Sequence, residues 1–492
     1  MKATFKRIPV ELLVFAASLA FLLSLEALFA RDAIQGVYFQ RWTSEDMMQT
    51  VSLIDLRAEP LQSLWYLHIQ PPLLDALRAL LAQFWPTAEP QLLLHNVDRG
   101  LYFLWAVTYA GMMALLYHWL KQLTQPVVAL VTTLGFAMHP AAILYATFLE
   151  NTILFSFGIL WSYYELWKLS KAPQARPIWR LSLSFLLLFV TRSVYQWHSI
   201  IIYILALLLM RIPTRKILAF AALTGLVVGL YTAKQYLLFG VTFSSSLSAG
   251  NCMHGLGNFS DYAGWGVADI PISPPPAPVG VLTREFRITG SSNFNYYTHL
   301  QYHKAIFSKC FELLLTQPWQ QTAYAWFGNL LIYLRPSSAF TTPHAIADRL
   351  PWRPVYNWLF SGIPLLLLIC SSLAISCRAM VVAGNQTRPL LRGLGLLLPA
   401  LMIFLMTVIF ERGENMRYKF FLEPVFYTFV VAQIYSAIAS GRKPPLIEET
   451  PCPAPGFNAI SRLGRYTNWR RKSMFRLAAV PASGRGMNSP DT

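Results

Sequence analysis

The sequence predicts an all-α polytopic membrane protein. Of its 492 residues, 55% are hydrophobic and only 13% are charged, whereas soluble proteins average about 25% charged residues. Long apolar runs recur along the chain, and a helix of about 20 residues is long enough to cross the hydrocarbon core of a bilayer. We therefore expect about 10 transmembrane helices, with external interfacial helices and one larger external loop region.

The first apolar run, Ile8 to Phe29, predicts a retained membrane anchor. It carries Glu11 and Glu26 and lacks a small-residue cleavage site, so it does not resemble a removed signal peptide. The runs that follow predict spans near 99–120, 126–146, 150–167, 181–192, 197–211, 217–238, 354–377, 393–410 and 418–439. The runs at 181–192 and 197–211 are short, which is typical of tilted or partly re-entrant helices.

The positive charge is distributed as in a membrane protein. The net charge is +17, but the basic residues form short clusters between apolar runs and in the tail, which marks cytoplasmic loops and argues against nucleic-acid binding. Lys2, Lys6 and Arg7 precede the first span, so both termini are expected in the cytoplasm. We expect a multi-pass protein of the bacterial inner (plasma) membrane whose site faces outward.

Four regions follow from this topology. Residues 1–238 would form an N-terminal transmembrane module with a catalytic first external loop at 30–98, and 239–353 an external loop and helical insertion. Residues 354–440 would form the C-terminal transmembrane helices, and the basic tail at 441–492 would be disordered in the cytoplasm.

Two external segments have more detailed expectations. The stretch LQSLWYLHIQPPLLDALRALLAQFW predicts one or two interfacial helices that end at Pro86. Residues 296–334 have helical periodicity, and these helices would cover the acidic loop or lie on the membrane face. Cys252 and Cys310 both fall in the insertion, where they either pair in an oxidising compartment or remain free.

Two adjacent acids, Glu45 and Asp46, follow the first span. A carboxylate can accept the proton of an attacking hydroxyl, and a like-charged neighbour raises the basicity of one member of the pair. The pair is therefore a candidate general base with a positioning acid. The alternative is two solvated loop acids.

His68 and Gln70 precede the pair Pro71-Pro72. An imidazole and an amide here could contact a phosphate while the prolines set the turn into the next helix. The alternative is a helix start that uses proline at its first position. Both interpretations can hold together.

Charged residues at predicted span ends are further candidates. Glu150 would face a cavity or a partner, because exposure to lipid is costly; alternatively it caps the next helix. Arg192 could pair with an acid or hold a phosphate. Arg417 and Lys419 belong to the charged segment ERGENMRYKFFLEP, which would either hold a lipid-linked phosphate or anchor the helix at the interface.

In order along the chain, SEDMMQTV, HIQPPLLD, Asp98-Arg99, Pro140, Glu150, Thr191-Arg192 and GENMRYKFFLEP resemble the motifs of one family. The chain resembles the GT-C superfamily of membrane glycosyltransferases, in particular glycosyltransferase family 39, related to protein O-mannosyltransferases and lipid A aminoarabinose transferases. The resemblance covers roughly residues 8 to 440.

The resemblance implies a polyprenyl-phosphate-linked sugar as donor and a lipid, glycan or protein as acceptor. Asp46 or Glu45 would be the base, although the order here is Glu-Asp where relatives commonly show Asp-Glu. Arg417, Lys419 and Arg192 would hold the donor phosphate, His68 and Gln70 would lie near the lipid phosphate, and Glu150 would be a second cavity acid. In the closing segment, Lys419 and Phe421 depart from the family's Arg and Pro.

The chemistry that these parts imply is a single displacement. The acceptor hydroxyl would attack the anomeric carbon opposite the departing lipid phosphate, which inverts that centre. The sequence predicts no particular cofactor, and a divalent cation is the alternative. The runner-up is a transporter or flippase for a lipid-linked or small solute, which would place charges near mid-bilayer and show internal repeats. The sequence shows no such repeat.

Overall fold

The computed structural model describes residues 9–31, 43–47, 50–256, 286–339, 350–362, 387–412 and 415–441. Regular structure in these ranges is helical, apart from one isolated bridge between Phe286 and Ser292. This confirms the all-α class. Most of the predicted span at 354–377 and nearly all of the tail lie outside the described residues.

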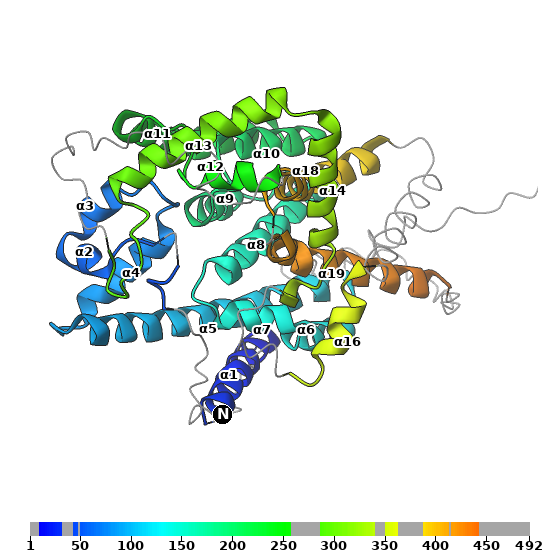
Figure 1. Ribbon diagram of the computed structural model, residues 1–492. Helices are drawn as coiled ribbons and strands as arrows, with labels where there is room; N and C mark the ends of the chain where they lie inside the picture. The colour runs from blue at the N-terminus through cyan, green and yellow to red at the C-terminus, as the bar shows by residue number, and fades with distance from the viewer. Residues whose placement is uncertain are drawn as a thin grey trace, which may run out of the picture.

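The longest helix, α5 (Pro90–Leu123), runs along one side of the molecule (Figure 1) and carries many of the buried residues. It packs against α1 (Val10–Arg31), α4 (Leu73–Phe84), α6 (Pro126–Ala137), α7 (Pro140–Thr147), α8 (Thr152–Lys171) and α19 (Asn415–Gly441). The sequence predicted its start near residue 99, but Pro90 occupies the first turn, where its missing N–H costs nothing. Asp98 therefore lies inside the helix and does not open it.

Three short helices lie beside the N-terminal part of α5 (Figure 1): α2 (Leu53–Ala58), α3 (Pro60–Trp65) and α4 (Leu73–Phe84). Helix α4 starts directly after Pro72 and stops before Trp85. The predicted break at Pro86 is confirmed, whereas Pro72 stands at the N-cap, just before the first helical position predicted for it. Helix α4 is amphipathic, and its buried side includes Asp75 and Arg78.

The central helices occur close to the predicted positions. They are α6 (Pro126–Ala137), α7 (Pro140–Thr147), α8 (Thr152–Lys171), α9 (Trp179–Thr191), α10 (Trp197–Leu209) and α11 (Thr214–Phe239). Helices α6 and α7 form one predicted span that bends by 57°. Pro140 cannot continue α6 because it lacks the N–H, and it starts α7 instead.

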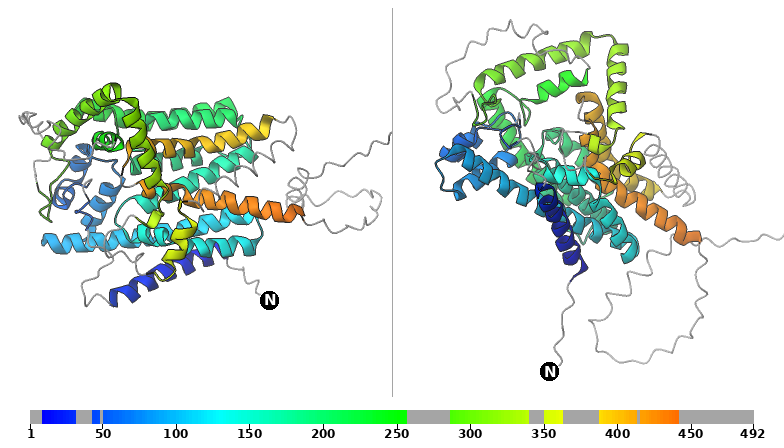
Figure 2. Two further views of the ribbon diagram at one scale, coloured as in Figure 1. Left: turned by 45° about the vertical axis from the view of Figure 1, so that its right-hand side comes forward. Right: turned by 60° about the horizontal axis from the view of Figure 1, so that its bottom comes forward.

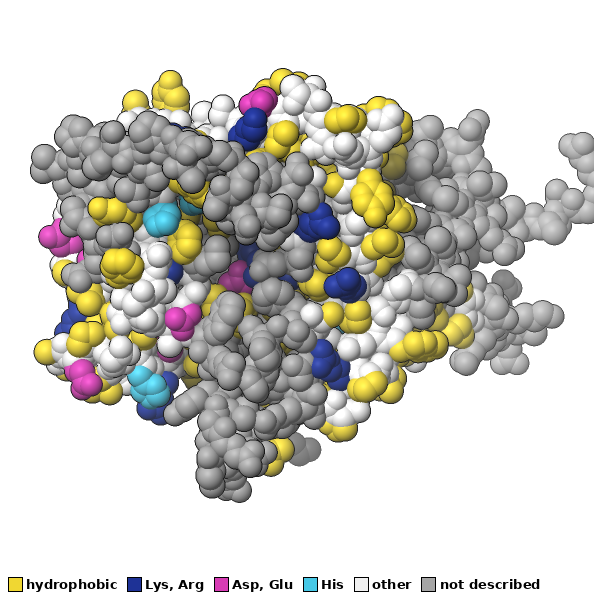
Figure 3. Space-filling view, viewed as in Figure 1, with side chains coloured by type: hydrophobic (Ala, Val, Ile, Leu, Met, Phe, Trp, Pro, Cys, Tyr) yellow, Lys and Arg dark blue, Asp and Glu magenta, His cyan; other side chains and the backbone are white. Residues whose placement is uncertain are grey.

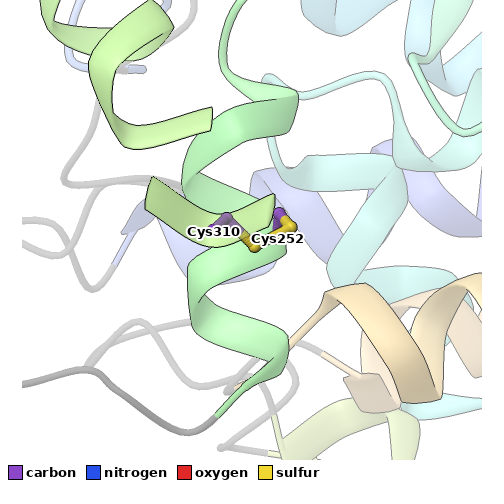
Figure 4. Close-up of a disulfide and its surroundings, with 2 residues drawn as sticks. All are labelled: Cys252 and Cys310. Atoms are coloured by element: carbon purple, nitrogen blue, oxygen red, sulfur yellow. A yellow bond between two sulfur atoms is a disulfide. The ribbon is translucent and has the colours of Figure 1, made fainter. Parts of the chain in front are cut away.

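The remaining helices are α12 (Ser248–Gly255), α13 (Tyr297–Thr316), α14 (Trp319–Tyr333), α16 (Arg353–Leu359), α18 (Thr387–Phe410) and α19 (Asn415–Gly441). Helix α18 packs against α10, and α19 against α8 (Figure 2). The predicted helical region at 296–334 is confirmed as α13 and α14. A disulfide between Cys252 and Cys310 joins α12 to α13 (Figure 4), so the two cysteines pair.

The prediction of about ten spans was wrong for the described chain. Four helices, α5, α11, α18 and α19, are long and apolar enough to cross a bilayer, and the bent pair α6–α7 makes five if it counts as one span. Helices α9 and α10 have 13 residues each and rise only about 20 Å, short of a core of about 30 Å. Helix α8 carries three charges in its last two turns: Glu165, Lys168 and Lys171.

Candidate functional site

The two adjacent acids have different environments. The side chain of Glu45 is fully buried and accepts hydrogen bonds from the backbone N–H groups of Leu53 and Ile288, the latter at 2.7 Å. Arg78 Nη2 lies 3.6 Å from Glu45 Oε1. Glu45 is therefore committed to holding the loop together.

Asp46 is only half-buried. Its Oδ2 accepts hydrogen bonds from the Thr43 backbone N–H at 2.7 Å and the Thr43 hydroxyl at 2.9 Å. Both hydrogen bonds that the described chain gives this carboxylate are to Oδ2, which leaves Oδ1 to accept a proton from a bound molecule. Of the predicted pair, Asp46 has the geometry of a general base.

The buried side chain of Arg78 on α4 holds the acidic loop through hydrogen bonds. Arg78 Nη1 donates to Asp75 Oδ1 and to the carbonyl of Val51, both at 2.7 Å, and Arg78 Nε donates to the Ser44 hydroxyl at 3.1 Å. Gln70 Nε2 donates to Asp75 Oδ2 at 3.0 Å. Gln70 was predicted to lie near a lipid phosphate, but this bond turns its amide toward the loop.

Asp98 fixes the loop to α5. Its two carboxylate oxygens accept from the Ser44 backbone N–H at 3.3 and 3.2 Å. Because Asp98 lies within α5, the acidic loop has a defined position along that helix. Asp98 entered the sequence analysis only as part of a family motif, with no assigned role.

The segment that starts at Phe286 covers the loop from the other side. Arg287 Nη1 donates to the Met47 carbonyl at 2.5 Å and to the Thr50 hydroxyl at 3.1 Å, and Arg287 Nη2 donates to the Ser292 carbonyl at 2.6 Å. Burial, with Arg78 nearby, lowers the pKa of Arg287 to about 10, so the guanidinium stays charged at neutral pH. This cover is a turn closed by the bridge between Phe286 and Ser292, and it precedes the helices that were predicted either to cover the loop or to lie on the membrane face.

His68 is buried between the same two parts of the chain. Its Nε2 lies 3.0 Å from the Asn295 carbonyl, so this nitrogen donates, and its Nδ1 accepts from the Ser246 hydroxyl at 2.9 Å. Burial and the neighbouring His303 lower the pKa of His68 to about 3. The ring is therefore neutral, and both nitrogens are used within the protein. His68 was predicted near a phosphate; the bonds of His68 and Gln70 do not reach Arg192 or Arg417.

A second charged cluster brings together three predicted residues from distant parts of the chain. Glu150 accepts from Arg192 Nη2 and from Arg417 Nη1, each at 2.6 Å, and from the Thr152 hydroxyl at 3.0 Å. Glu150, Arg192 and Arg417 are all buried. Both guanidinium groups meet the single carboxylate of Glu150, and Arg192 Nε is buried with no hydrogen-bond partner among the described residues. We call Glu150, Arg192 and Arg417 the arginine cluster.

Aromatic side chains border the arginine cluster. The guanidinium carbon of Arg192 lies 5.8 Å from the ring centre of Tyr418 and 5.4 Å from that of Phe421. These contacts hold the flat guanidinium group in one orientation. Seen from one side, acidic and basic side chains adjoin near the middle of the molecule's surface (Figure 3).

Helix α5 links the cluster to the acidic loop. Trp105 Nε1 donates to the Glu150 carbonyl at 2.8 Å, while Asp98 holds Ser44. Residues 98 and 105 lie on one face of the helix, about two turns and about 10 Å apart. Both predicted halves of the site are therefore built on the same side of α5.

Lys419 does not belong to the arginine cluster. It follows Arg417 by two positions on α19, which is about 200° around a helix. Its ammonium group donates to the carbonyls of Arg335 and Phe360, the latter at 3.1 Å. The sequence predicted that Arg417 and Lys419 hold the same phosphate. In the structure their charged groups point in different directions and contact different partners.

Four further residues complete the acidic loop: Asp75, Arg78, Asp98 and Arg287. Asp75 and Arg78 had a sequence signal, because two opposite charges three positions apart stand on one side of an otherwise apolar helix. The sequence signal for Asp98 is that it is an acid in a long apolar helix. Arg287 had none, since its partner Met47 is 240 positions away.

A metal site has no support within the described ranges, where no group of three or more His, Cys, Asp or Glu side chains could hold an ion. Comparison with known proteins gives no family assignment: no family model and no curated protein matches this chain.

Proposed function

We propose that the protein is an integral membrane glycosyltransferase that moves a sugar from a polyprenyl-phosphate donor to an acceptor hydroxyl on the external face of the membrane. The observation that carries the proposal is the arginine cluster, a buried pair of guanidinium groups held by one carboxylate and attached to the same face of α5 as the loop that carries the half-buried Asp46. A displacement with a phosphate leaving group requires a base for the acceptor hydroxyl and cations for the departing phosphate, and these two groups would supply them.

The cluster is suited to an anion. A buried guanidinium N–H without an acceptor is costly, and Arg192 Nε has none among the described residues, so a negative group that accepts from it would stabilise the cluster. Arg192 and Arg417 could each turn a second donor toward phosphate oxygens while Glu150 holds them apart. The rings of Tyr418 and Phe421, which meet edge to face, would keep water away from the leaving phosphate.

Asp46 is the group that would take the proton. As the acceptor oxygen bonds to the anomeric carbon, the bond from that carbon to the phosphate oxygen breaks, and the hydroxyl proton passes to Asp46 Oδ1. The arginines stabilise the charge on the departing polyprenyl phosphate. One displacement inverts the anomeric centre, and no covalent enzyme intermediate forms.

The resemblance to family 39 of the GT-C superfamily supports the same reaction, through the ordered motifs that include Asp46, Glu150, Arg192 and Arg417. Lys419 and His68 are excluded from phosphate binding in this proposal, because their polar atoms are bonded within the protein. The sugar and the acceptor stay open.

The proposal is tested with the purified protein in proteoliposomes that contain lipid-linked sugars extracted from cell membranes. We expect release of free polyprenyl phosphate, coupled one-to-one to sugar transfer. Arg417→Lys should raise the KM for the donor about tenfold, since lysine keeps the charge but cannot keep two contacts. Lys419→Arg, at a site outside the cluster, is the control. Solute or lipid flux without sugar transfer would support the transporter instead.

A further inference from the structure

A cavity of about 420 Å³ opens where the transmembrane helix α11 ends. Helix α11 stops at Phe239, and Gly240 takes the left-handed conformation with φ of +66° that ends a helix. The cavity lies between the residues that follow Gly240 and one side of α13. Helix α11 is long and apolar enough to cross a bilayer, and a helix that does so ends at the bilayer surface, which would place the cavity at the depth of lipid headgroups.

One wall of the cavity is polar and basic. Lys304 is half-buried there beside His303 and the Ser246 hydroxyl. A methyl group on Gly240 would lie 3.0 Å from Lys304 Nζ, so the glycine leaves room for this ammonium group. Among ion pairs between described residues, none includes Lys304, whereas Lys309 on the same helix pairs with Glu312 at 2.8 Å.

The other wall is aromatic and reaches the surface. Phe243 and Phe307 lie with ring centres 5.0 Å apart, and Phe311, which also lines the cavity, is 58% exposed. Leu237 at the end of α11 and Leu315 on α13 are exposed as well. An apolar surface therefore continues from the cavity onto helices that border the membrane.

We propose that this cavity binds a membrane amphiphile with an anionic phosphate headgroup. Lys304 and the hydroxyl groups of Thr242 and Ser308, which also line the cavity, would take the phosphate, and the phenylalanines would take the first part of the hydrocarbon chain. The ligand is either a membrane phospholipid or a polyprenyl phosphate, which share this chemistry. The site is separate from the arginine cluster, whose members lie before α8, after α9, and on α19.

A ligand bound in the cavity would also affect the acidic loop. The Ser246 hydroxyl that lines the cavity bonds to His68 Nδ1 and lies 3.2 Å from His303 Nδ1. The Ser246 backbone N–H also donates to the His68 carbonyl at 2.8 Å. A headgroup in the cavity would therefore pack against the residue that holds the turn before α4.

The test uses the full-length protein in phosphatidylcholine nanodiscs and a hexadecyl phosphate that carries a photoreactive diazirine in its chain. Hexadecanol with the same diazirine is the uncharged comparison. Labelled peptides are identified by mass spectrometry in the wild type and in the variants Lys304→Glu, Lys304→Arg and Lys309→Glu. Competition with phosphatidylglycerol and with farnesyl phosphate identifies which source of phosphate the cavity prefers.

We expect the phosphate probe, and not the alcohol, to label peptides from 240–246 and 297–316. Lys304→Glu should reduce this labelling about tenfold, while Lys304→Arg and Lys309→Glu retain it. Equal labelling by the alcohol, or labelling that Lys304→Glu leaves unchanged, would overturn the proposal. The result does not depend on sugar transfer, so it stands or falls separately from the proposed enzyme activity.

Discussion

Asp98 and Trp105 lie on one face of α5, and each holds a different half of the candidate site. Asp98 accepts from the Ser44 backbone N–H, and Trp105 donates to the Glu150 carbonyl. The spacing between the acidic loop and the arginine cluster is thus set by one continuous helix, which cannot stretch without breaking its backbone hydrogen bonds. A rigid distance of this kind is what positioning of two substrates requires.

The buried Arg78 should be essential for stability. Arg78→Ala leaves the carboxylates of Asp75 and Glu45 buried without their cation, a change that typically costs about 3–5 kcal/mol. Thermal unfolding in detergent, followed by tryptophan fluorescence, measures it. Lys309→Ala removes an exposed ion pair and should cost less than about 1 kcal/mol. Equal effects of the two substitutions would contradict the assigned role of Arg78.

The protein should lose stability in mild acid because of two buried histidines. Burial and His303 lower the pKa of His68 to about 3, with further contributions from Lys234 and His299. Burial and His299 lower the pKa of His303 to about 4. The unfolded chain takes up protons near pH 6.5, before the folded one does, so stability is full above that pH and falls as the pH drops toward 3.

The measurement for the histidines is the unfolding temperature between pH 7.5 and pH 4.5. These pH limits are about one unit above and two below the ordinary histidine pKa. Glutamine cannot titrate in this pH range. In the His68→Gln variant the unfolding temperature should therefore fall less between pH 7.5 and pH 4.5 than it does in the wild type. A mutant profile as steep as that of the wild type would show that His68 is not responsible.

The disulfide between Cys252 and Cys310 should stabilise the α12–α13 pair. It closes a loop with a sequence separation of 58, for which chain entropy predicts about 4 kcal/mol. A reductant should lower the unfolding temperature of the wild type. The double variant Cys252→Ser and Cys310→Ser should already unfold at the lower temperature and should not respond to reductant. A response of the double variant would point to another thiol.

Gly255 marks the closest approach of α12 to α18. A Cβ at this position would lie 1.9 Å from the Ile409 carbonyl oxygen, so Gly255→Ala forces the two helices apart. We expect a loss of about 1–3 kcal/mol in the free energy of unfolding. Gly229→Ala is the matched control, since nothing lies within 4 Å of its added methyl group. That variant should be neutral or more stable by about 0.5–1 kcal/mol.

The helices were predictable because apolar periodicity and proline positions are local signals. The start of α5 was missed because its first three turns carry polar residues, one of which, Asp98, contacts the acidic loop. The number of spans was overestimated because an apolar run shows that a helix is buried without showing that it is long enough to cross the membrane. Helices α9 and α10 illustrate this difference.

The site was predictable in part. Glu150, Arg192 and Arg417 were candidates from their charge in apolar surroundings, and the structure brings them into contact. The sequence could not separate Glu45 from Asp46, because neighbours in a loop reveal nothing about which one is buried. It also could not detect Arg287, whose contacts to the loop depend on the fold of a distant segment.

The most direct test is sugar transfer by the Asp46→Asn variant, measured with saturating lipid-linked donor. The central claim is that Asp46 accepts the acceptor's proton while Glu45 only holds the loop. It predicts that Asp46→Asn lowers the transfer rate by at least about 100-fold, with an unchanged unfolding temperature and unchanged donor binding. Glu45→Gln should lower the unfolding temperature. An Asp46→Asn variant that transfers sugar at the wild-type rate would contradict the claim.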